Sequence, residues 1–237
     1  MNKRGYSLIE SSLCLALFLF ILIAVFESFG ITRSLFFKLK RAEEDNQSAL
    51  AALDKMRIDL IRAGSGLAPQ MRMGMVEGVA IINSVLVISR REKECFLLAD
   101  ITPGENRMVL ETAAGLSPGR EVCVFNDEGG EIRTISSIVG KTVLVDAPFE
   151  AYYSMGESQV APLDKTFLFF DQKTGSIRRK VNTSSPQPLL DDILFFDFFY
   201  QKDVNLAGLS FALLNNKEKK YELYVYPKNV ALGHPRP

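Results

Sequence analysis

An uncharged apolar run lies close to the N-terminus of the chain. From Ser11 to Phe26 the sequence reads SSLCLALFLFILIAVF, with no charged residue and two serines at its start. Counted from Leu8, the run is long enough to cross a bilayer as a helix, which requires about 17 to 25 residues. The pattern therefore predicts one membrane-spanning helix at this end.

The segment after the apolar run has the pattern of an amphipathic helix. Apolar or small residues recur there in alternating steps of four and three, the spacing of a packed helix seam. They are Leu35, Leu39, Ala42, Ala49, Leu53, Met56, Leu60 and Ala63, with Asn46 in the one missing place. We expect a membrane half over residues 6–30 and an amphipathic half over residues 31–66, with the seam packed on a folded domain.

The end of this helix is also marked in the sequence. Gly64, Gly66 and Pro69 supply the residues that stop a helix. One continuous helix from about Tyr6 to Ala63 is therefore expected. The alternative is a membrane helix followed by a separate coiled-coil stalk, because Gly30 lies between the two patterns.

From Met75 onward the pattern changes to short β-branched and aromatic runs divided by turn residues, which is typical of antiparallel strands. The candidate strands are Val85–Ser89, Cys95–Asp100, Met108–Glu111, Glu121–Phe125, Glu131–Ile138, Thr142–Val145, Thr166–Phe170, Ser176–Val181, Leu194–Tyr200, Leu209–Leu214 and Tyr221–Tyr226. The sequence thus predicts an α+β fold, a long N-terminal helix packed on a β-rich domain over residues 67–237. A smaller set of strands near residues 116–149 is predicted to be inserted in the larger sheet.

Composition excludes several classes of function. Lysine and arginine number 28, as do aspartate and glutamate, so no basic excess is present to track nucleic acid. Three cysteines and the single His234 do not form a zinc-binding pattern. No basic or nucleophilic residue lies at a sequence spacing from His234 that would suggest a catalytic pair. We therefore expect no catalytic residues, no metal and no cofactor, and the chain is not predicted to be an enzyme. The acidic turn Asn126–Glu131 carries oxygen ligands suited to calcium, but a solvated hairpin is the better interpretation.

The cysteines differ in setting. Cys14 lies within the apolar run and is expected to pack as a small hydrophobe. Cys95 and Cys123 lie in apolar strand patterns, and a domain outside the cytoplasm would meet oxidising conditions. A disulfide between them is a possibility, with two buried free thiols as the alternative.

A carboxylate stands at the start of the membrane run. Glu10 follows the short basic leader containing Lys3 and Arg4, and an ionised acid there costs free energy unless it finds a partner. If a peptidase cuts between Gly5 and Tyr6, the new amino group of Tyr6 is a cation that can pair with Glu10 of a neighbouring chain. A cleaved secretory signal is the alternative, although the residues after Phe26 lack a small-x-small cleavage site.

The stretch RGYSLIES resembles the N-terminal signal of type IV pilins and type II secretion pseudopilins. The resemblance implies that prepilin peptidase cuts after Gly5 and N-methylates Tyr6, and that Glu10 forms the assembly salt bridge. Tyr6 stands where phenylalanine is commoner, and the proline of many major pilins is missing from the apolar run. Together with the segment from Asp59 to Gly64, the layout is similar to PilW-type minor pilins and the J-type minor pseudopilin.

This resemblance also implies location and partners. A single-pass protein of the bacterial inner membrane is expected, with its C-terminal domain in the periplasm before it joins a pilus or pseudopilus. Its partners would be prepilin peptidase, other major and minor pilins or pseudopilins, the inner-membrane assembly platform and membrane lipid. The four basic residues Arg33, Lys38, Lys40 and Arg41 after the run conflict with this orientation, because basic residues favour the cytoplasmic side.

Two hypotheses about function follow. The first is a non-enzymatic minor pilin or pseudopilin that initiates or tips a filament. The second is a membrane-anchored periplasmic binding protein that does not polymerise. Glu10 favours the first, because a lone anchor has no use for a carboxylate at the start of its membrane run.

Overall fold

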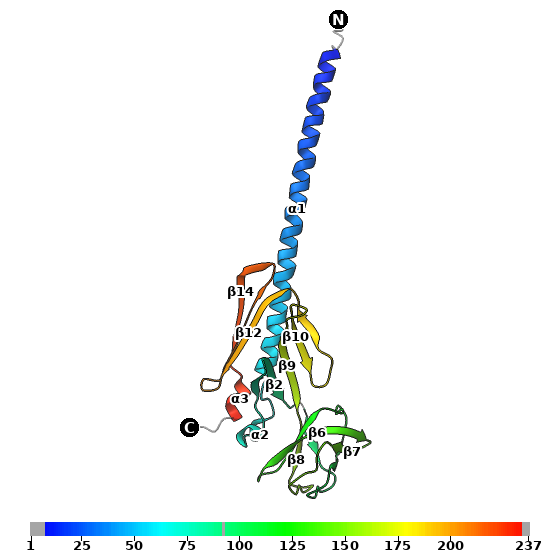
Figure 1. Cartoon of the computed structure of the whole chain (residues 1–237), viewed down its shortest axis with the longest axis vertical. Coiled ribbons are helices and arrows are strands. Elements are labelled where there is room, and N and C mark those ends of the chain that lie inside the picture. Colours follow the sequence, from blue (N-terminus) through cyan, green and yellow to red (C-terminus); the bar gives the residue numbers. More distant parts are fainter. Residues whose placement is uncertain (1–7, 92, 234–237) are drawn as a thin grey trace. The chain divides into compact units, whose positions relative to one another are not determined.

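The computed structural model describes residues 8–91 and 93–233, and the chain divides after Leu50 into two compact units. Helix α1 (Leu8–Ile61) runs for 54 residues and continues through Gly30 without a break (Figure 1). The single continuous helix is therefore confirmed, and no separate stalk begins at Gly30. The helix ends as predicted: Gly64 adopts a φ of 71°, a conformation that glycine accepts readily.

The first unit consists of α1 up to Leu50, and its apolar side chains from Leu8 to Leu39 are exposed. Within the described part of the chain, α1 is the one helix long and apolar enough to cross a membrane. This follows from length and composition, and an N-terminal signal sequence has the same properties.

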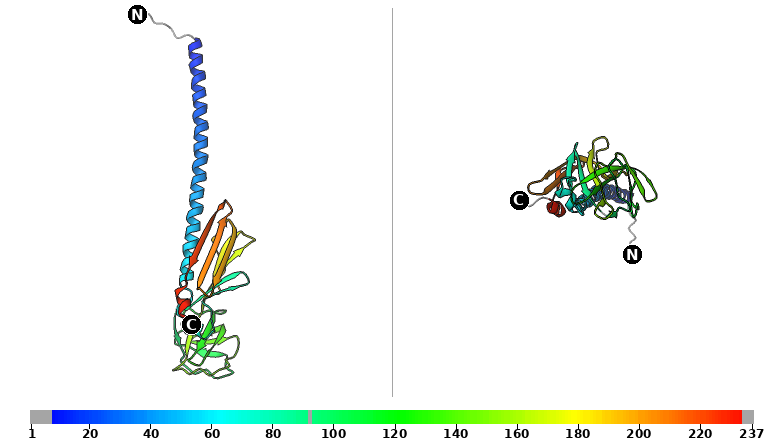
Figure 2. Two further views of the ribbon diagram at one scale, coloured as in Figure 1. Left: turned by 90° about the vertical axis from the view of Figure 1, so that its left-hand side faces the viewer. Right: turned by 90° about the horizontal axis from the view of Figure 1, so that it is seen from below.

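Over its described residues, the second unit contains the end of α1, two short helices and three antiparallel sheets. The helices are α2 (Ala68–Arg72) and α3 (Lys228–Gly233). One sheet has the order β1 (Val79–Ile82), β2 (Val85–Arg90), β9 (Asp164–Asp171), β10 (Ser176–Val181) and β11 (Gln187–Leu190). The strands β12 (Ile193–Gln201), β13 (Leu206–Leu213) and β14 (Asn216–Val225) lie side by side in a second sheet, orange to red in Figures 1 and 2. The predicted α+β fold is confirmed.

The third sheet forms a lobe of its own. Its order is β3 (Cys95–Phe96), β8 (Gln159–Pro162), β5 (Glu121–Phe125), β6 (Gly130–Val139), β7 (Thr142–Val145) and β4 (Arg107–Val109). Strands β2 and β9 pair directly, with Arg90 opposite Asp164, so the whole lobe is inserted in the β2–β9 hairpin. The insertion therefore runs from residue 91 to 163, well beyond the predicted 116–149. Its main core draws all its buried members from Cys95 to Val160.

Within the second unit, most residues of the predicted helix seam are buried. In the second unit Met56, Leu60 and Ala63 are buried, as predicted, whereas Leu53 is half-buried and Ala52 takes the buried place beside it. Leu39 is 71% exposed and Ala42 is exposed as well. Both residues belong to the first unit, which ends at Leu50.

A polar contact reinforces this packing. Asp59, 4% exposed at its side chain, accepts hydrogen bonds from Arg179 Nε at 2.7 Å and from a terminal nitrogen of Arg179 at 3.0 Å. The two-pronged geometry suits a guanidinium and a carboxylate. It ties the last turns of α1 to β10, which lies 120 residues further along the chain.

Candidate functional site

The first candidate site is the start of α1. Glu10 lies in the first helical turn, where the partial positive charge of the helix N-terminus favours an acid. The next charged residue is Glu27, so the sixteen residues from Ser11 to Phe26 between them carry no charge. Gly5 and Tyr6, the predicted cleavage and methylation positions, lie outside the described residues.

Hydroxyl groups along α1 bond within the helix. Ser12 Oγ donates to the Leu8 carbonyl at 2.9 Å, and Thr32 Oγ1 donates to the Ser28 carbonyl at 2.9 Å. Such local bonds remove the need for water, which suits a helix in an apolar medium. Beyond the run, Arg33 lies with its guanidinium 5.6 Å from the centre of the Phe37 ring. Glu10 is the one residue from Leu8 to Phe26 that carries a charge, and a charge within a membrane costs free energy unless it is paired.

The second candidate site is a cleft in the inserted lobe. It has a volume of about 880 Å³ and lies between the β5–β6 turn and the segment that leads to β8. The lining residues are Asn126, Asp127, Glu128, Gly129, Gly130, Glu131, Glu150, Ala151, Tyr152, Tyr153, Ser154 and Glu157. Five of these are acids and none is basic, so the cleft attracts cations.

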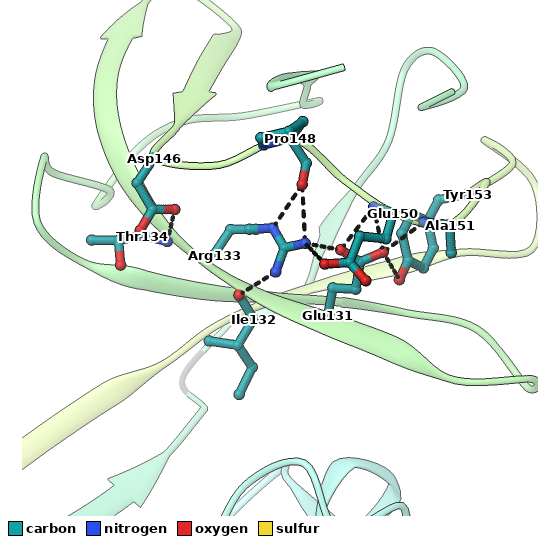
Figure 3. Close-up of polar contacts among 9 residues, drawn as sticks. All are labelled: Glu131, Ile132, Arg133, Thr134, Asp146, Pro148, Glu150, Ala151 and Tyr153. Atoms are coloured by element: carbon teal, nitrogen blue, oxygen red, sulfur yellow. Dashed lines mark hydrogen bonds and ion pairs between the residues drawn. The ribbon is translucent and has the colours of Figure 1, made fainter. Parts of the chain in front are cut away.

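Glu131, whose side chain is 13% exposed, is the central acid of this cleft (Figure 3). Its carboxylate accepts hydrogen bonds from the Ala151 amide at 2.8 Å, the Glu150 amide at 3.0 Å and the Tyr153 hydroxyl at 3.1 Å, and it pairs with Arg133. Burial by itself raises the pKa of Glu131, but these bonds and the Arg133 charge outweigh it and lower the pKa. Burial and the neighbouring Glu131 charge raise the pKa of Tyr153 above its usual value. Glu131 is thus a fixed anion that holds the cleft wall in place.

Arg133, also on β6, adds further contacts to the same segment. We call the contacts of Glu131 and Arg133 with this segment the brace. Its Nε donates to the Pro148 carbonyl at 3.2 Å, and its guanidinium lies 5.7 Å from the centre of the Phe149 ring. Nearby, the Thr134 amide donates to Asp146 at 3.0 Å. Figure 3 shows the hydrogen bonds and ion pairs that join β6 to Asp146, Pro148, Glu150, Ala151 and Tyr153. Sequence reasoning missed this brace, because nothing in the sequence signals a contact between segments so far apart.

The acidic turn at one edge of the cleft is held together by its own side chain. Asn126 Oδ1 accepts hydrogen bonds from the amides of Glu128 and Gly129, both at 3.0 Å. This is the local bonding expected of an asparagine in a tight turn. These bonds in the turn between β5 and β6 agree with the hairpin predicted for residues Asn126–Glu131. Among the described residues, no group of three histidine, cysteine or acidic side chains is placed to hold a metal ion.

The structure does not bring Cys95 and Cys123 together, and both are buried free thiols. Strand β8 lies between their strands, with Cys95 opposite Val160 and Cys123 opposite Ala161. Because neighbouring strand residues point to opposite faces, the two side chains belong to different core clusters. Of the two alternatives that the sequence left open, the structure shows the buried free thiols and not the disulfide. Burial raises the pKa of the Cys95 thiol and raises that of Cys123 to about 12.

Comparisons with known proteins give little further guidance. No protein-family model and no curated protein matches this chain. Among solved structures, the tailspike gp61 of Pseudomonas phage phi297 shares 23% identity at a TM-score of 0.28, over 30% of this chain and 14% of that one. The Gp54 tailspike of Acinetobacter baumannii bacteriophage AP22, in complex with capsular saccharide, shares 14% identity at 0.29, over 32% of this chain and 15% of that one.

The phage phi92 endosialidase shares 10% identity at a TM-score of 0.21, covering 59% of this chain and 32% of its own length. This chain therefore spans at most about a third of each of these proteins. All three TM-scores lie below 0.5, so the likenesses establish neither a common fold nor a function. The fold and the first site define an α+β protein with one N-terminal apolar helix, of the kind that spans a membrane or serves as a signal.

Proposed function

We propose that this chain is a minor pilin or pseudopilin, a non-enzymatic subunit that prepilin peptidase processes before it joins a type IV pilus or type II secretion pseudopilus. The observation that carries the proposal is Glu10 at the head of a long helix whose apolar side chains are exposed. Such a surface needs lipid or other apolar helices around it. Only a neighbouring polar group can satisfy the carboxylate in that setting.

The RGYSLIES stretch supplies that group. Cleavage after Gly5 creates an α-amino cation on Tyr6, and stacked helices would bring it to Glu10 of an adjacent subunit. Paired in this way, both charges can enter an apolar bundle, and one pair fixes the axial register of the subunits.

Processing is tested by intact-mass analysis of the protein from its native membrane. We expect loss of residues 1–5 and one added methyl group on Tyr6. A protein that keeps Met1, or one that is cut after Phe26, would rule out this processing and favour an uncut anchor or an ordinary signal.

Assembly is tested by replacing Glu10 with Leu. Membrane insertion should persist, since an acid within a membrane helix is penalised by about 2.5 to 3.5 kcal/mol and its removal favours insertion. Incorporation into filaments should fail, because a partnerless buried cation costs about 3 to 5 kcal/mol.

Glu27→Leu is the matched control, as it removes one acid from the far end of the same run. Both variants are compared by membrane fractionation and by recovery in sheared filaments. If Glu10→Leu assembles as well as Glu27→Leu, Glu10 does not set the register and the filament proposal fails.

A second candidate is a membrane-anchored periplasmic binding protein. The observation that favours it is the cleft around Glu131, because a cleft of about 880 Å³ is large enough for a ligand. In this case both glutamate variants would be recovered equally in membranes and neither would be found in filaments. Fusing alkaline phosphatase after the C-terminus tests the orientation that both candidates require, since the fusion is active only in the periplasm.

A further inference from the structure

One face of the three-stranded sheet is apolar and buried, and the other faces solvent. Phe196, Phe211 and Tyr221 lie in one cross-strand row on the buried face. The neighbouring rows point the opposite way because side chains alternate along a strand. They consist of Asp197, Ser210 and Glu222 in one row and Phe199, Gly208 and Tyr224 in the next.

These two rows border a hollow of about 210 Å³. Gly208 forms its floor: a Cβ there would lie 2.2 Å from the Phe199 ring, so the ring rests directly on the backbone of β13. Phe199 is 40% exposed and Tyr224 is 58% exposed. Their ring centres lie 6.3 Å apart with planes inclined at 53°. Two aromatic rings therefore present apolar surface to solvent beside the hollow.

The polar side chains of the hollow retain bonding capacity. Asp197 and Ser210 are direct cross-strand partners, and neither side chain forms a hydrogen bond with any residue that the structure describes. Lys220 pairs with Glu222 at 2.7 Å, so this part of the face has both signs of charge. The hollow thus combines aromatic surface with an acceptor, a hydroxyl and an ammonium donor.

We propose that this hollow binds a carbohydrate. A sugar ring has apolar C–H faces that suit the rings of Phe199 and Tyr224, and hydroxyl edges that can bond Asp197 and Ser210. A volume below the roughly 300 to 1,000 Å³ of sites for drug-sized ligands matches about one sugar ring. An apolar helix of another subunit fits less well, because it would bury the charged side chains of Asp197 and Lys220 that line the hollow.

The test is binding of the full-length chain to an array of defined bacterial glycans. The protein is kept in a zwitterionic detergent, since detergents with sugar headgroups would compete for the hollow. We expect the wild-type chain to bind one or more glycans. Tyr224→Ala and Asp197→Asn should each weaken that binding at least tenfold.

Phe96→Ala is the matched control, because Phe96 is 48% exposed and lies on β3 in a different sheet. It should bind like the wild type. Asp197→Asn preserves shape, so its loss of binding cannot be ascribed to misfolding. The proposal is overturned if the wild-type chain binds no glycan on the array, or if both variants bind as well as Phe96→Ala. Variants that bind glycans normally but fail to enter filaments would instead identify this face as a subunit contact. Because Glu10 plays no part in this binding, the outcome is independent of the filament proposal.

Discussion

Replacing Asp59 with Ala should strongly destabilise the second unit. Arg179 is 20% exposed at its side chain, so the substitution leaves a largely buried guanidinium without its two hydrogen bonds to the carboxylate. Breaking a buried pair in this way typically costs about 3 to 5 kcal/mol. A domain with a total stability of about 5 to 15 kcal/mol would lose a large share of it.

An exposed ion pair in the same unit provides the control. Lys202 and Glu77 approach to 2.5 Å, but their side chains are 59% and 54% exposed. Solvent-exposed pairs contribute about 0 to 1 kcal/mol, so Glu77→Ala should change stability little. The contrast between the two substitutions isolates burial, since both remove one acid from an ion pair.

Urea unfolding of the full-length chain, followed by tyrosine fluorescence, measures the difference. The chain has no tryptophan, and all its tyrosines except Tyr6 lie from Tyr152 to Tyr226, within the second unit. The double variant Asp59→Leu with Arg179→Leu should recover much of the loss, because replacing both charges by apolar groups is often neutral. Equal effects of Asp59→Ala and Glu77→Ala would refute this reasoning.

Three further predictions concern the inserted lobe. The free energy of unfolding should fall as pH rises from about 9 to 12, because burial raises the pKa of the Cys123 thiol from 9.0 to about 12. Over this range the thiol stays protonated in the folded chain and ionises in the unfolded chain. Urea midpoints measured across the range should fall less in Cys123→Ala than in the wild type. Neither Cys95 nor Cys123 should react with iodoacetamide in the folded chain or be linked in a non-reducing digest, and a linked peptide found by mass spectrometry would contradict this. Glu131→Ala should destabilise the lobe by at least about 2 kcal/mol, since it removes several hydrogen bonds to a charged group, whereas Asp127→Ala at the exposed turn should have little effect on the same unfolding curve.

Local patterns predicted most of the elements. The long helix, its end at the glycines and strands such as β5, β7 and β10 follow from apolar spacing and turn residues. The missed strands were β1, β8 and β11. Each has four residues, and β8 and β11 contain the prolines Pro162 and Pro188, which argue against a strand when only neighbouring residues are considered. Pairing with strands distant in the sequence forms them.

Contacts between distant segments explain the remaining errors. The insertion was predicted too short because its limits are set by the pairing of Arg90 with Asp164, which no local pattern reveals. The possible disulfide between Cys95 and Cys123 is not formed because strand β8, which the sequence did not predict, lies between β3 and β5, the strands that carry the two cysteines. The contacts of Glu131 and Arg133 were missed because their partners lie up to 22 residues further along the chain.

The site of insertion bears on how the two candidate functions can be separated. Asp164, at the junction, is buried and bonds Arg120 and the side-chain amide of Asn182, the latter at 3.0 Å. Asp164 therefore links β9 both to Arg120 of the lobe and to Asn182 next to β10, while the lobe has a main core of its own. Substitutions of exposed acids in the cleft should leave the β2–β9 pairing intact. A loss of ligand binding from the cleft and a loss of assembly from Glu10 would thus be independent observations on one chain, and a subunit that carries both functions would show both.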